Sequence, residues 1–199
     1  MDSIIEKSRV IEKNDDEGNI GFYRENRKYF DNFDILTDIE TIEEIILIKQ
    51  KYCEAIERKG YYKELTVIIN QIFILLAKIK SKSQKNHHYY ERALFYQAIA
   101  LGRQNKYSAS NHIFKELKII DPGNESYKNW YQSNKKKISN QLFSFCENSI
   151  MIITVFTVFF GYDIFGPANT IILILIFVLF IGTFLSTHLL RKKMSKSIN

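Results

Sequence analysis

The sequence predicts an all-α protein that consists of a helical head and a C-terminal transmembrane helical hairpin. Apolar residues between 37 and 140 recur at helical spacing, and no stretch alternates apolar and polar residues as a half-buried strand does. The stretch 142–190 contains only two charged side chains, Glu147 and Asp163. With two prolines and eight glycines among 199 residues, the composition is also unlike that of a collagen or a Gly/Ser-rich chain.

The first 36 residues are charged throughout, and we expect residues 1–36 to form a mobile or weakly helical arm. A polar break at 14–19 interrupts any longer helix there. Helical periodicity becomes clear only from Thr37 onward. The arm is therefore predicted to be a segment of its own, separate from the helical domain.

The helical domain is predicted to cover 37–140 and to contain five helices. Thr37 and Glu40 form a capping box at the start of the first helix, and Gly60 ends that helix. A polar loop is expected at 81–88. The predicted helices cover 37–60, 62–80, 89–104, 107–120 and 125–140.

A membrane anchor of two antiparallel spans, about 143–163 and 169–190, is expected within 141–191. The second span lies in 27 residues without a formal charge, and about 20 apolar residues are enough to cross the hydrocarbon core of a bilayer. Only 15 uncharged residues separate Glu147 from Asp163. An alternative for the first segment is therefore an interfacial or re-entrant helix, with a single span after it.

Basic residues lie at both outer ends of this predicted hairpin, whereas the turn between the spans holds only Asp163. The positive-inside rule then places the head and both termini on the cytosolic face, or its stromal or matrix equivalent, of a bacterial or organellar membrane. Such residues attract anionic lipid headgroups, and we favour lipid over nucleic acid as the reason for the net charge of +6. The predicted membrane-surface residues are Lys135, Lys136, Lys137, Arg191, Lys192 and Lys193, and a basic tail covers 192–199.

Large and small residues follow a repeat-like spacing over 91–122. Leu94 is bulky, Ala98 is small enough to let two helices cross closely, and Phe114 fills the space beneath them. Pro122 stops the second helix of the pair. These residues match positions of the tetratricopeptide repeat, a helix-turn-helix unit that this segment therefore resembles.

A second, more degenerate copy of the pattern begins at Ile46, with Cys53 at the position of the small residue. The resemblance implies two repeats whose first helices line a concave groove for a partner protein. Basic and apolar side chains together suit an amphipathic helix with acidic flanks, although the chain's own arm could instead cover Phe95 and Ile99. The predicted groove residues are Gln50, Glu54, Arg92, Phe95, Ile99 and Arg103.

The sequence contains no nucleotide-binding motif, no paired catalytic carboxylates and no metal-ligand spacing. We therefore expect no enzyme and no cofactor or metal. The resemblance instead implies a membrane-anchored adaptor or assembly factor that holds a partner protein at the membrane surface and can assist the biogenesis of a membrane complex. Two alternatives remain: a structural subunit of a membrane complex, or a tail-anchored receptor similar to the fission adaptors of mitochondria and peroxisomes.

Overall fold

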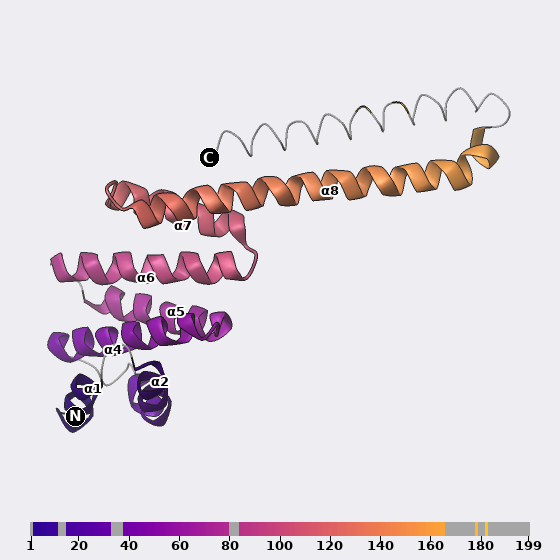
Figure 1. Cartoon of the computed structure of the whole chain (residues 1–199). Helices are drawn as coiled ribbons and strands as arrows, with labels where there is room; N and C mark the ends of the chain where they lie inside the picture. Colours follow the sequence, from indigo (N-terminus) through magenta and orange to yellow (C-terminus); the bar gives the residue numbers. More distant parts are fainter. Residues whose placement is uncertain are drawn as a thin grey trace. The chain divides into compact units, whose positions relative to one another are not determined.

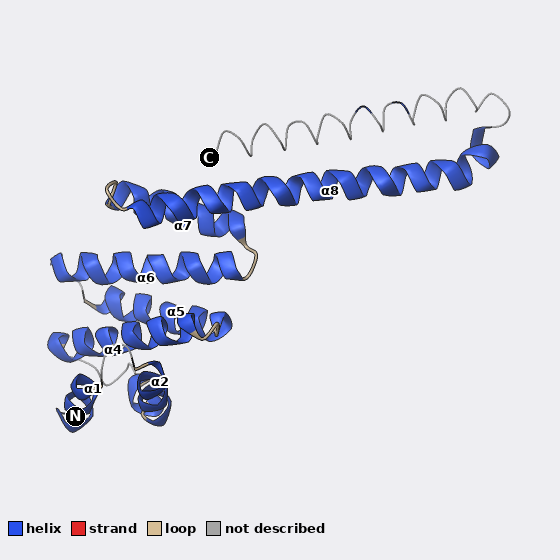
Figure 2. Cartoon of the chain, viewed as in Figure 1, coloured by secondary structure: helices blue, strands red, loops and turns tan. Residues whose placement is uncertain are grey.

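The computed structural model describes residues 2–11, 15–32, 38–79 and 84–165, together with Val178 and Gly182. All regular secondary structure in these ranges is helical (Figures 1 and 2), which confirms the all-α prediction. The helices are α1 (Asp2–Val10), α2 (Asp16–Glu25), α3 (Arg27–Phe30), α4 (Ile39–Arg58), α5 (Tyr62–Lys78), α6 (Gln84–Arg103), α7 (Tyr107–Ile120) and α8 (Glu125–Phe165).

The chain divides into two compact units, Met1–Asn134 and Lys135–Asn199. The first unit is the head, and it contains α1 to α7 with the first ten residues of α8. Within it, α4 and α5 form one helical hairpin and α6 and α7 form the next, and the hairpins stack through α5 and α6 (Figure 1). The helix pairs expected at these places are therefore present.

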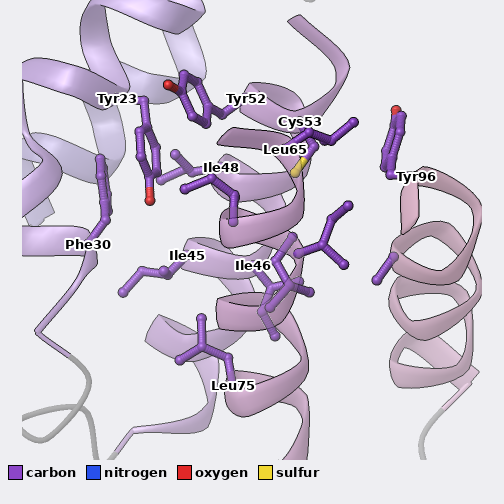
Figure 3. Packing of buried hydrophobic residues seen from close by; sticks show 14 of the residues in the cluster. Tyr23, Phe30, Ile45, Ile46, Ile48, Tyr52, Cys53, Leu65, Leu75 and Tyr96 are labelled. Carbon is purple, nitrogen blue, oxygen red and sulfur yellow. The ribbon is translucent and has the colours of Figure 1, made fainter. Parts of the chain in front are cut away.

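Two groups of buried apolar side chains hold the head together. The larger group lies around α4 and α5 (Figure 3), where Ile45, Ile46 and Leu75 are fully buried. The smaller group lies between α6, α7 and the start of α8 and is centred on Phe114. Phe73 and Phe95 pack against both groups. Each hairpin therefore buries its apolar face against a neighbouring element, as stacked helical hairpins must.

The arm at 1–36, expected to be mobile or weakly helical, forms helices α1 to α3 in the residues that the structure describes, and α2 and α3 pack against the first hairpin. Tyr23 and Phe30 are almost completely buried in the larger group (Figure 3). The Tyr23 ring stacks on Phe30 at 5.3 Å and on Tyr52 of α4 at 4.1 Å between centroids. Four ion pairs also join α2 and α3 to the first hairpin: Asp16–Arg58, Glu17–Lys59, Arg24–Glu64 and Asp31–Lys49.

Three helix boundaries follow from local chemistry. The Asp38 carboxylate caps α4 by accepting hydrogen bonds from the backbone N–H and the hydroxyl of Thr41, at 2.9 and 2.8 Å. Gly60 lies in the middle of the α4–α5 connection with φ of 81°, a conformation that favours glycine. Helix α6 begins at Gln84, inside the predicted loop 81–88, since Gln and Lys favour helix and no Gly or Pro breaks the stretch.

Helix α8 is continuous from Glu125 to Phe165, so it joins the predicted head helix 125–140 to the first predicted span 143–163. No Gly or Pro occurs between 125 and 160 to interrupt it. Within the residues that the structure describes, no helix is both long and apolar enough to cross a membrane. The second predicted span, 169–190, lies outside the described residues except for Val178 and Gly182.

Candidate partner-binding site

Two charged residues of the predicted groove, Glu54 and Arg92, are paired with each other. Arg92 of α6 donates to the Glu54 carboxylate of α4 at 2.7 Å. The same carboxylate accepts a hydrogen bond from Arg58 at 3.0 Å. Arg58 in turn binds both carboxylate oxygens of Asp16 in the arm. This ladder runs from α2 through α4 to α6, so Glu54 and Arg92 serve the chain's own packing.

Three other residues of the predicted groove are packed inside the head, which corrects the expectation that they line an open surface. Gln50 has no exposed side-chain area, and its amide donates to the backbone carbonyl of Tyr89 at 2.9 Å. Ile99 is 4% exposed and belongs to the smaller apolar group. Phe95 is half-buried between Phe114 of α7 and Tyr127 of α8, at 6.2 and 5.6 Å between ring centroids.

Helices α7 and α8 therefore cover Phe95 and Ile99. The alternative interpretation expected the arm to cover them. The Tyr127 hydroxyl donates to Glu91 at 2.7 Å and ties α8 to α6. Asn134 is fully buried, and its amide donates to Ser110 of α7 at 2.8 Å. Helix α8 thus closes the second hairpin through specific hydrogen bonds as well as through aromatic packing.

Arg103 is the predicted groove residue that remains exposed. Its guanidinium carbon lies 6.0 Å from the ring centroid of Tyr62 on α5 and 5.5 Å from that of Trp130 on α8. These distances are those of cation–π contacts. No carboxylate of the described residues lies within ion-pair distance of Arg103. The positive charge is therefore held in place by two aromatic rings without being neutralised by a carboxylate.

An open depression of about 460 Å³ lies at the α4–α5 turn, beside Tyr62. Gln104, which directly follows α6, links that helix to α5. Its amide donates to the Tyr62 carbonyl and to the Thr66 hydroxyl, both at 3.1 Å. The lining residues are Gly60, Tyr61, Tyr62, Lys63, Glu64 and Gln104. None of these was among the residues predicted to bind a partner, because the tyrosines and Gly60 read as ordinary turn positions.

The one carboxylate in this lining is already engaged. Glu64 accepts hydrogen bonds from Arg24 at 3.0 Å and from the Tyr52 hydroxyl. Burial, followed by the bond to Glu64, raises the pKa of Tyr52 to about 12. The Arg24 guanidinium also lies 5.6 Å from the ring centroid of Tyr61. A ligand at this depression would therefore meet two tyrosines, each with a guanidinium over its ring.

A buried lysine cluster fastens the arm to the first hairpin. Lys49 has no exposed side-chain area, and its ammonium donates to Tyr23 at 2.6 Å, Gln71 at 2.8 Å and Asp31 at 3.2 Å. Burial lowers the pKa of Lys49 to about 8, while the Asp31 carboxylate opposes this shift. The sequence carried one signal for the cluster, since Lys49 falls on the same helical stripe as Ile45 and Tyr52.

Cysteine burial and metal-ligand clusters complete the description of the reactive side chains in the described part of the chain. Cys53 is fully buried, and burial raises the pKa of its thiol. No group of three or more His, Cys, Asp or Glu side chains that could hold a metal ion occurs among the described residues. Of the predicted membrane-surface residues, Lys135, Lys136 and Lys137 lie on α8 in the second unit. The others, Arg191, Lys192 and Lys193, lie outside the described residues.

No protein-family model, no curated protein and no solved structure matches the chain.

Proposed function

We propose that this protein is a membrane-anchored adaptor or assembly factor whose tetratricopeptide-like head holds a partner protein at the membrane surface. The observation that carries the proposal is the surroundings of Arg103. Its guanidinium has no carboxylate partner among the described residues and lies over the rings of Tyr62 and Trp130. The open depression at the α4–α5 turn is next to it. Glu54 and Arg92, the other two charged residues of the predicted groove, are paired within the chain. We therefore propose that the partner binds at this end of the helical stack.

The membrane part of the proposal rests on the apolar stretch 142–190, with its two charged side chains. In the described part of this stretch, large apolar side chains of α8 are exposed, including Phe145 and Ile152. Exposed apolar surface of this kind is typical of contact with lipid or with another helix. Lys135 and Lys136 are exposed just before it, where they would lie among anionic headgroups.

Amine-specific crosslinking in native membranes, followed by affinity purification and mass spectrometry, tests this function. We expect crosslinks from exposed head lysines, Lys63 and Lys106, to one substoichiometric partner. Co-purification of a whole complex in equal amounts, with crosslinks confined to Lys135 and Lys136, would instead show a resident structural subunit. Absence of both kinds of product would contradict partner binding at a membrane.

A further inference from the structure

We infer that the depression at the α4–α5 turn, which we call the turn pocket, is the docking site of the partner and that it takes a peptide segment with one apolar side chain next to acidic residues. This inference rests on the proposed function and adds the place and the chemistry of recognition. The turn pocket is defined by its lining, Gly60, Tyr61, Tyr62, Lys63, Glu64 and Gln104.

The walls of the turn pocket favour an apolar side chain. Tyr61 exposes 48% of its area, so part of its surface is open to a ligand at the depression. Tyr62 forms the adjacent wall, and Gly60 adds no side chain to obstruct the space. Exposed, rigid aromatic rings beside a depression are the usual anchor points of protein interfaces, because they bury a large area at a small cost in side-chain entropy.

The charges around the turn pocket select an acidic occupant. Arg103 lies over the Tyr62 ring without a carboxylate partner among the described residues, and Lys63 is exposed in the lining. The only carboxylate of the lining, on Glu64, is bound by Arg24. The pocket therefore presents an excess of positive charge, and a carboxylate from the occupant would complement the planar guanidinium of Arg103.

A protein segment fits this pocket better than a lipid surface does. Recognition of anionic lipid requires a cluster of several basic residues, and the run Lys135 to Lys137 on α8 is the better candidate for that role. The turn pocket has one cation in its lining, Lys63, and two guanidinium groups over the rings of its two tyrosines. Its shape is also preformed, because Gln104 bonds α6 to the first turn of α5 at two points.

Selection from a library of random dodecamer peptides against the detergent-solubilised full chain tests the inference. We expect peptides that combine a Leu, Phe or Trp with Asp or Glu nearby. Arg103→Glu should weaken binding of a selected peptide by about tenfold, since it removes a charged hydrogen bond and adds a repulsion. Tyr61→Ala should weaken it by a similar factor, because the aromatic anchor is lost.

The matched control is Lys115→Glu, which makes the same change of charge at an exposed position on α7. It should leave peptide affinity unchanged, and circular dichroism should show equal helicity for all variants. Binding that survives both Arg103→Glu and Tyr61→Ala would overturn the inference, as would displacement of the peptide by anionic phosphatidylserine vesicles.

The two experiments distinguish a wrong location of the docking site from a wrong proposed function. If the wild-type chain enriches no peptide, the turn pocket is not a peptide site, while crosslinking in native membranes still reports whether a partner exists. If a partner is captured in membranes and Arg103→Glu leaves that capture intact, the function stands and the location is wrong.

Discussion

Replacing Tyr23 with alanine is expected to lower the free energy of unfolding by about 4 kcal/mol, as is usual for truncation of a buried aromatic side chain. Tyr23 is 1% exposed, its ring stacks on Tyr52 and Phe30, and its hydroxyl accepts a hydrogen bond from Lys49. The substitution therefore leaves a cavity and also removes a partner from a buried ammonium group. Urea unfolding of the detergent-solubilised chain, followed by circular dichroism, measures the change.

Tyr90→Ala is the control for the Tyr23 substitution. Tyr90 is 39% exposed, its ring lies edge-on to Phe73, and its hydroxyl interacts with Glu116, so its loss should cost about 1 kcal/mol. Equal effects of the two substitutions would contradict the packed position of Tyr23. They would restore the interpretation of 1–36 as a mobile arm.

The free energy of unfolding is expected to rise by about 2 kcal/mol between pH 8 and pH 10 because of Lys49. Burial lowers the pKa of Lys49 from 10.5 to about 8 in the folded chain. Between these values the unfolded chain retains a proton that the folded chain has released. The unfolded state binds more protons, so stability increases with pH in this window.

Tyr23 and Tyr52, which belong to the same core, set the upper pH limit of this increase in stability. Burial raises the pKa of Tyr52 to about 12 and raises that of Tyr23 as well. Above about pH 10 the folded chain therefore retains protons that the unfolded chain loses, and stability should fall. Burial by itself would raise the pKa of Asp31, but hydrogen bonds from Arg27 and Lys49 lower it overall. The contribution of Asp31 to the pH dependence of stability is therefore complete well below pH 8.

Lys49→Met isolates the contribution of the lysine, because methionine keeps a similar length without a titratable group. Replacing a buried charge with an apolar residue is often close to neutral for stability. The variant should show a flat profile between pH 8 and pH 10 when chemical unfolding is measured at each pH. A rise of the same size in wild type and variant would assign the effect to other groups.

The helices of the head could be predicted from sequence because their apolar residues repeat along one face. Ile42, Ile45 and Ile56 lie on the buried side of α4, as their spacing requires. The arm was not predicted to pack because its aromatic residues are divided between two short helices, α2 and α3. A helix of four residues, such as α3, is too short to display a periodic stripe.

The position of the candidate site could not be predicted because periodicity shows which face of a helix is apolar but not which neighbour covers it. Phe95 and Ile99 occupy groove positions of the repeat pattern, yet α7 and the start of α8 cover them. Arg103 was predicted to bind and remains exposed, with the rings of Tyr62 and Trp130 beside its guanidinium. The adjoining turn pocket depends on how Gln104 bonds to α5, a contact with no local sequence signal.

Extraction of native membranes with alkaline carbonate tests most directly the central claim that this protein acts from a membrane. We expect the full chain to remain in the membrane pellet. Ile174→Lys combined with Val178→Lys should shift part of the chain into the supernatant with its head still helical, because charge at the centre of the proposed second span costs several kcal/mol and leaves the segment 143–163 as the remaining anchor. Recovery of the unaltered chain in the supernatant would contradict the claim.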